Sequence, residues 1–188
     1  MDPDDLQLHT KIVGALPAIN HFMERLHLFD ILKSRLPAGN DPDTSQCIGI
    51  LIRNILISRE PLYGIEEWIS GFPAELLGIS EENVRRINDD RIGRSLERLF
   101  DTDRSSPMTE IVVSAVREFD LSMKRFHNDS TSVALSGLYR TATGKDMRMK
   151  RTVNLTFGHS KDHRKDLKQS LCGYSQSLRM VQFPYITM

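Results

Sequence analysis

The chain has 188 residues, of which 39% are hydrophobic, and its 25 Lys/Arg and 25 Asp/Glu give a formal net charge of zero. This length suits one domain, or one domain and part of another, and the apolar content is that of a globular protein with a core. The sequence contains no Gly-rich phosphate loop, dinucleotide fingerprint or Ser/His/Asp triad spacing, which argues against those classes of nucleotide-binding protein and hydrolase.

The charges are distributed unevenly. Residues 1–120 contain 13 Lys/Arg and 21 Asp/Glu, whereas residues 121–188 contain 12 and 4. An acidic front and a basic back favour a polyanionic partner for the back half. On charge alone, a solvated basic tail is an equally good interpretation.

Targeting and membrane signals are absent from the sequence. The opening MDPDDLQLH is acidic and lacks the apolar core of a signal peptide. The most apolar stretch, Cys47 to Ile57, is interrupted by Arg53 and Asn54 and is too short and polar to span a bilayer. Cys47 and Cys172 have no metal-ligand spacing and are expected to be buried thiols. We therefore expect a cytoplasmic protein with no membrane partner.

Helical periodicity begins near the N-terminus. Apolar residues recur at helical spacing over 19–26, and residues 28–36 continue as a second apolar segment. Thr44 or Ser45 is expected to cap the next helix, and Glu60 before a proline is expected to stop it, since that position resists helical dihedrals.

Further helices follow up to about residue 120. A short helix is expected over 65–69, and Ser80 is expected to start another that has acids in its first turn. Asp89 or Asp90 is expected to begin the next helix, and residues 108–119 form the last.

The character of the sequence changes after residue 120. Residues 124–135 are rich in β-branched and aromatic side chains and predict a strand. Residues 137–151 read as a connection, 152–157 as a short extended piece, and 162–171 as a polar helix or loop. We place a domain boundary at about residue 120.

Asp129 is the main candidate for chemistry, because it stands near the end of a strand-like run, in HNDSTSV. Phosphoryl transfer on DNA uses divalent ions held by several carboxylates, and Mg²⁺ prefers such oxygen ligands. A turn or capping residue, aided by Asn128 and Ser130, is the alternative reading of Asp129.

The segment GHSKDHRKDLKQ, residues 158–169, is the second candidate. Its HxxxH pair lacks the Glu of the zincin motif and the third ligand that a zinc site needs. Its basic residues are better suited to phosphate contacts, although a solvated basic face explains them equally well. These candidate DNA contacts are Lys161, Arg164, Lys165 and Lys168.

Five segments in order resemble bacterial DDE transposases of the insertion-sequence class, which carry a helical domain ahead of a ribonuclease-H-like catalytic domain. The segments are LPAINHFMERLHL (16–28), LIRNILISREPLYGIEEW (51–68), INDDRIGRSLERLFD (87–101), FHNDSTSV (126–133) and GHSKDHRKDLKQ (158–169). The resemblance covers roughly residues 12–173.

The resemblance implies a role for Asp129. In such transposases the first catalytic Asp lies on the first strand of the ribonuclease-H-like sheet, in a D-S-T context, and Asp129 followed by Ser130 and Thr131 matches it. Asp129 would then be the first acid of the DDE triad and a Mg²⁺ ligand. The helical domain is implied to help recognise transposon ends, and the basic segment leads toward the second strand.

The C-terminal part departs from the family. The second Asp and the Glu of the triad are not found, because Asp146, Asp162 and Asp166 do not follow a clear central strand. After Gly173 the sequence YSQSLRMVQFPYITM also differs from the family, in which a strand, a turn and another strand are expected. We hypothesise that a frameshift near codon 174 produced residues 174–188.

The expected fold is a mainly α N-terminal domain (1–120) followed by an incomplete α/β ribonuclease-H-like fragment (121–173) and an out-of-frame tail (174–188). Residues from about 136 onward are expected to pack loosely, since a sheet gains stability from three or more strands. The expected function is that of a truncated transposase, inactive alone. The alternatives are a competitor that binds DNA, full-length transposase or itself, and a pseudogene product with no role.

Overall fold

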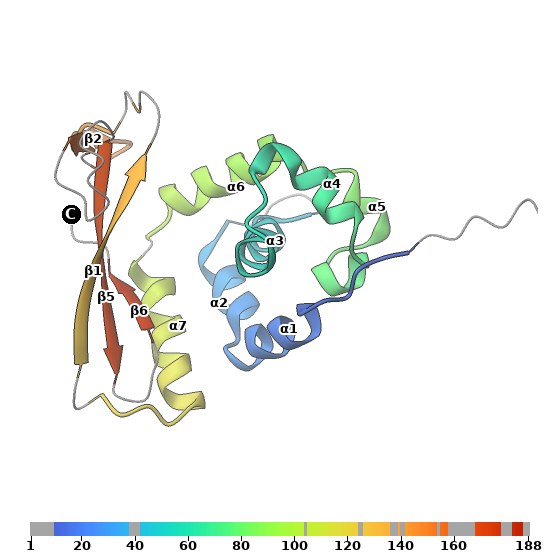
Figure 1. Cartoon of the computed structure of the whole chain (residues 1–188), viewed down its shortest axis with the longest axis horizontal. Coiled ribbons are helices and arrows are strands. Elements are labelled where there is room, and N and C mark those ends of the chain that lie inside the picture. Colours follow the sequence, from blue (N-terminus) through green and yellow to red (C-terminus); the bar gives the residue numbers. More distant parts are fainter. Residues whose placement is uncertain are drawn as a thin grey trace, which may run out of the picture. The chain divides into compact units, whose positions relative to one another are not determined.

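The computed structural model describes residues 10–37, 42–103, 105–123, 126–135, 139, 142–153, 155–157, 168–177 and 182–185. The chain divides into two compact units, Met1–Ser114 and Ala115–Met188. The first unit is built of helices, and the second contains strands (Figure 1). The described chain is mainly helical, which confirms the helical part of the predicted fold class.

Helices of the first unit follow one another with short connections, as the sequence periodicity predicts. The helices and 3-10 turns, in chain order, are α1 (Leu16–Arg25), α2 (Leu28–Arg35), α3 (Thr44–Ile57), η2 (Leu62–Gly64), α4 (Ile65–Ser70), η3 (Ala74–Leu77), α5 (Glu81–Val84), α6 (Asp89–Asp101) and α7 (Ser105–Glu118). The last of these, α7, crosses the division between the units.

Helix α3 begins with a capping box. The carboxylate of Asp43 accepts a hydrogen bond from the backbone N–H of Gln46 at 2.8 Å, and the Gln46 side chain accepts one from the Asp43 N–H at 2.8 Å. These two bonds satisfy donors that a helix start otherwise leaves unpaired. The predicted caps Thr44 and Ser45 are therefore wrong, and both residues are buried in the first turn instead.

The core of the first unit consists of two clusters that share α3. The larger cluster is formed by Leu16, Cys47, Ile50, Ile65, Ile69, Phe72, Ala74, Leu77, Ile79, Ile87 and Ile92. The smaller is formed by Met23, Leu28, Leu32, Leu36 and Ile48. Helix α3 contributes to both and is surrounded by the other helices of its unit (Figure 1). Its Cys47 is a buried thiol, as expected.

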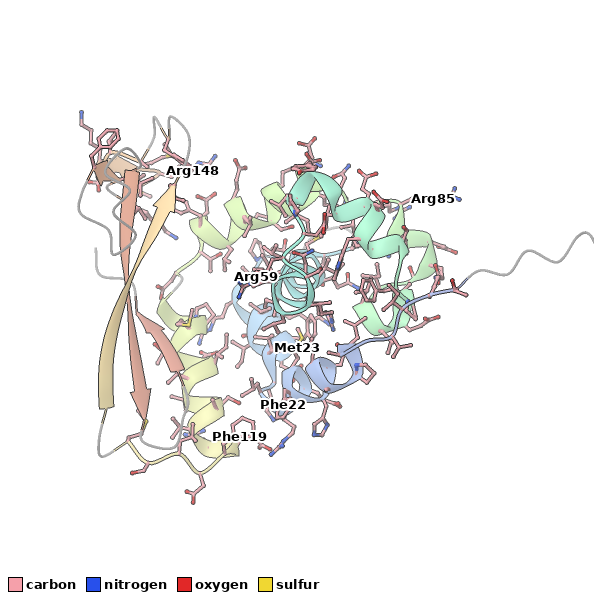
Figure 2. All side chains as sticks on the ribbon, viewed as in Figure 1. Phe22, Met23, Arg59, Arg85, Phe119 and Arg148 are labelled. Atoms are coloured by element: carbon pink, nitrogen blue, oxygen red, sulfur yellow. The ribbon has the colours of Figure 1, made fainter. Side chains whose placement is uncertain are left out.

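The helical periodicity of α1 places some of its side chains in the core and others on the surface. Met23 is 5% exposed within the smaller cluster, whereas the neighbouring Phe22 is 49% exposed (Figure 2). Burial of an apolar side chain of this size contributes about 1.5–3 kcal/mol to folding. No helix in the part of the chain that the structure describes is long and apolar enough to cross a membrane.

The second unit contains a sheet with β5 in the middle. The long strands β1 (Phe126–Leu135) and β5 (Lys168–Ser177) pair antiparallel over their whole length. Strands β4 (Thr156–Phe157) and β6 (Gln182–Tyr185) also pair antiparallel with β5. A separate two-stranded ladder joins β2 (Asp146–Met147) to β3 (Lys150–Arg151).

One expectation for this unit needs correction. Residues 168–171 were expected in a polar helix or loop, but they begin β5, because pairing with β1 outweighs their weak local preference. Residues 168–177 and 182–185 form backbone ladders. Much of the segment after residue 136 lies outside the described residues, so its expected loose packing stays a prediction. The strand expected over 124–135 is confirmed for 126–135.

Candidate functional site

Asp129 lies on β1, the first strand of the sheet. In the antiparallel ladder it stands opposite Tyr174 of β5, and its neighbours Asn128 and Ser130 stand opposite Ser175 and Gly173. A residue inside such a ladder has its backbone fixed by the pairing with the next strand. Asp129 is therefore part of a strand and not of a turn. The roles of its side chain as a cap or as a metal ligand both stay predictions.

Only one of the four predicted DNA contacts falls within the described chain. Lys168 is the first residue of β5 and pairs with Leu135 of β1 and Phe157 of β4. Lys161, Arg164 and Lys165 lie outside the described residues. The ladder partner of Asp129 is Tyr174, which lies six residues after Lys168 on β5. The backbones of Asp129 and Lys168 are therefore about 20 Å apart along the ladder. Lys168 does not lie beside the candidate acid.

The described strands do not pair Asp129 with any of the other aspartates considered from the sequence. Asp146 lies on β2, in the separate two-stranded ladder, and is exposed. Asp162 and Asp166 lie outside the described residues, as does the HxxxH pair His159 and His163. Nowhere in the described ranges do three or more His, Cys, Asp or Glu gather as a metal site requires. Among the residues that the structure describes, Asp129 is the one acid on the sheet formed by β1, β4, β5 and β6.

The charged residues at the start of α6 have structural roles. Asn88 caps this helix by accepting a hydrogen bond from the backbone N–H of Arg91 at 2.9 Å. Asp89 begins the helix, as predicted, but the cap lies one residue earlier. Arg98 donates to Thr44 Oγ1 at 3.1 Å and so joins α6 to α3. These contacts are those of helix capping and of packing between helices.

A buried arginine on α3 was not singled out by sequence reasoning. Arg53 is 3% exposed, and its Nε donates a hydrogen bond to Asn20 Oδ1 at 2.8 Å. Asn20 is itself held by a hydrogen bond from Nδ2 to the carbonyl of Leu76 at 2.8 Å. The Arg53 Nη1 has no hydrogen-bond partner among the described residues. Burial lowers the pKa of Arg53 to about 10, so the guanidinium keeps its charge at neutral pH.

An aromatic ring and two glycines surround this guanidinium. Its central carbon lies 5.3 Å from the centre of the Phe29 ring, within the range of a cation–π contact. A Cβ added at Gly49 would stand 2.6 Å from two Phe29 ring atoms and 3.1 Å from Arg53 Nη1. A Cβ added at Gly78 would stand 3.5 Å from Arg53 Nη2. The two glycines leave room for the ring and for the guanidinium.

The sequence contained a signal for the buried arginine. Arg53 and Asn54 interrupt the most apolar stretch of the chain, where a charged and an amide side chain are unusual. The structure buries both, and Asn54 Nδ2, like Arg53 Nη1, has no partner among the described residues. The polar pair therefore lies inside the helical unit and does not mark a solvent-facing stripe.

Comparison with known protein families matches residues 8–113 to a domain of unknown function, DUF4277. The match spans more than half of the 188 residues. The chain belongs to the DUF4277 family. Comparisons with curated proteins and with solved structures found no match.

The DUF4277 region coincides with the helical unit. It contains α1 to α6 and the first part of α7, and therefore also Arg53 with its contacts Asn20 and Phe29. Asp129 and the four basic residues lie beyond it. The family match therefore describes the helical part of the chain and assigns no activity to the sheet.

Proposed function

We propose that this chain is the N-terminal part of a DDE-type insertion-sequence transposase, in which the DUF4277 region precedes the beginning of a ribonuclease-H-like catalytic domain. The observation that carries the proposal is the position of Asp129. It stands in a D-S-T context on the first strand of the sheet, directly beside the long strand that follows the basic segment. The resembling transposases carry their first catalytic acid on such a strand.

Within this function, Asp129 is one of three acids that hold Mg²⁺. The metal supplies activation of the attacking oxygen and stabilisation of the leaving oxygen during DNA cutting and joining. Asp129 would contribute a carboxylate, and its backbone is fixed within a ladder of ten paired positions between β1 and β5. One carboxylate does not hold two ions, so we expect no catalysis from Asp129 without the other two acids.

The basic segment contributes DNA contact. Lys161, Arg164, Lys165 and Lys168 would neutralise backbone phosphates, and the excess of Lys/Arg in residues 121–188 supports a polyanionic partner. Contacts of this kind position DNA without reading its sequence. Lys168 is about 20 Å along the ladder from Asp129, so it would contact phosphates away from the reacting one.

The test is a strand-transfer assay on the protein with its reading frame restored at codon 174. The proposal expects Mg²⁺-dependent joining of DNA ends, and a loss of at least about 100-fold in Asp129→Asn, because the amide is a poor Mg²⁺ ligand. Asp146→Asn, an exposed aspartate in a separate ladder, is the matched control and should retain activity. Equal activity of wild type and Asp129→Asn would exclude Asp129 as a catalytic acid.

A second candidate function is a binding module that competes with full-length transposase. The observation that favours it is that the DUF4277 region has its own core of two clusters around α3. Such a product would bind transposon-end DNA or transposase without catalysis. Gel shifts of the purified chain across a salt series test this candidate, since phosphate contacts weaken binding steeply as salt rises. Absence of binding to DNA and to full-length transposase would exclude it.

A further inference from the structure

The Arg53 guanidinium lacks the partner that a buried charge requires. It is 3% exposed, and no carboxylate pairs with it among the described residues. Its protein contacts are a neutral amide oxygen on Nε and the face of an aromatic ring. Removing a cation from water costs several kcal/mol unless an opposite charge or a full set of hydrogen bonds replaces the water. Nη1 has neither.

The guanidinium is held in place by two contacts. Asn20 fixes Nε at 2.8 Å, and Leu76 in turn fixes Asn20. The Phe29 ring covers the guanidinium face at 5.3 Å and occupies space that any side chain at position 49 would take. Such anchoring restricts the rotamers of a side chain that would otherwise turn its charge toward solvent.

Gly78 lies next to the guanidinium. This residue is exposed and has φ +76, a conformation that L side chains rarely adopt. The position of a Cβ there lies 3.5 Å from Nη2, so a side chain at 78 would cover this edge. The Gly78 carbonyl accepts a hydrogen bond from Gln46 Nε2 at 3.1 Å, which ties the turn to α3. The position of that Cβ has the two Nη atoms of Arg53 at 3.5 and 3.9 Å and no other atom outside the turn within 4 Å, so there is space beside the guanidinium.

We propose that Arg53, positioned by Asn20 and Phe29 and reached beside Gly78, is a binding site for a single phosphate group. The Nη1 and Nη2 groups of a guanidinium form a fork that matches two oxygens of a phosphate. A bound phosphate supplies both the missing acceptor for Nη1 and the missing negative charge. The source is either free phosphate or a backbone phosphate of a nucleic acid, and the site does not depend on the proposed transposase function.

The first experiment measures thermal unfolding of the full chain by the fluorescence of Trp68, its single tryptophan. Chloride is replaced by inorganic phosphate at constant ionic strength and pH 7.5. At about five times the dissociation constant, Tm should rise by about 2–4 °C in the wild type. Arg53→Met should show no rise, and Arg94→Met, which removes an exposed arginine of α6, should respond like the wild type. An unchanged wild-type Tm, or an equal rise in Arg53→Met, would overturn the proposal.

A second measurement does not depend on the folding of the Arg53 variant. The ¹H–¹⁵N guanidinium resonances of Arg53 in the wild type should shift and saturate as phosphate is added, and should not respond to chloride at the same ionic strength. Resonances that do not shift would exclude the site. A parallel titration with a short DNA duplex identifies the source: an Arg53-dependent response to the duplex assigns the site to nucleic-acid phosphate, and a response to inorganic phosphate alone assigns it to the free ion.

Discussion

Substitution of Gly49 by alanine tests the arrangement around α3 directly. The added methyl would stand 2.6 Å from two atoms of the Phe29 ring, closer than real Cβ atoms approach. Either the helix shifts, or the ring moves away from Arg53 and loses its cation–π contact. Overpacking of this kind costs about 1–3 kcal/mol. Alanine is also about 1 kcal/mol better than glycine inside a helix, so the net destabilisation is about 0–2 kcal/mol.

Gly93→Ala is the matched control, because Gly93 also lies inside a helix and a Cβ there meets nothing within 4 Å. Its expected effect is a stabilisation of about 1 kcal/mol from helix propensity. The propensity term cancels between the two variants. The difference in their free energies of unfolding is therefore the packing cost at Gly49, about 1–3 kcal/mol.

Urea unfolding followed by Trp68 fluorescence provides the assay, because Trp68 packs against the larger cluster and reports on the helical unit. The midpoint of Gly49→Ala should fall below that of Gly93→Ala with an unchanged slope, since the surface exposed on unfolding is the same. Equal midpoints, or a higher one for Gly49→Ala, would refute the close approach of Phe29 to α3.

Three further predictions follow from other parts of the chain. Asp43→Ala should lower the free energy of unfolding by about 1 kcal/mol in the same urea assay, because both bonds of the capping box with Gln46 are lost; an effect below the error would contradict the cap. Burial lowers the pKa of Arg53 to about 10, so the folded wild type carries the cost of a buried charge below pH 10 and loses that cost as the side chain deprotonates above it. The free energy of unfolding of the wild type relative to Arg53→Met should therefore rise between pH 9 and pH 11. Parallel pH curves of the two proteins would contradict this. The purified 188-residue chain should give no strand-transfer product with Mg²⁺, and measurable product would show that acids other than Asp129 complete a site.

The helices were predictable because their apolar residues repeat at the period of a buried helix face. Their exact starts were less predictable, since Asp43, Thr44 and Ser45 are three adjacent residues that each favour a cap. Only the geometry of the Gln46 side chain selects Asp43. The α6 cap differs by one residue for the same reason, because Asn88 precedes two aspartates that also suit a first turn.

The second unit was harder to predict than the first. Strand β1 has the β-branched residues of a strand, but β5 reads KQSLCGYSQS, with few of them. Its strand conformation depends on pairing with a segment more than thirty residues away, which no local pattern encodes. Asp129 was singled out by its local D-S-T context, and its place on a strand was correct; its role as a metal ligand stays a prediction.

Arg53 shows a different limit of sequence reasoning. An arginine in an apolar helix usually extends its charge to solvent along its aliphatic stem. Here Asn20, Phe29 and the space left by Gly49 come from other helices or other turns and hold the charge inside. No single segment contains that information, so the buried guanidinium appears only once the helices are packed.

The nucleotide sequence on both sides of codon 174 tests the proposal that Asp129 is the first acid of a DDE transposase. We predict that another reading frame continues the sheet after Gly173 and encodes, further downstream, a second Asp and a Glu of the triad. A locus in which no frame encodes such a continuation would exclude the proposal.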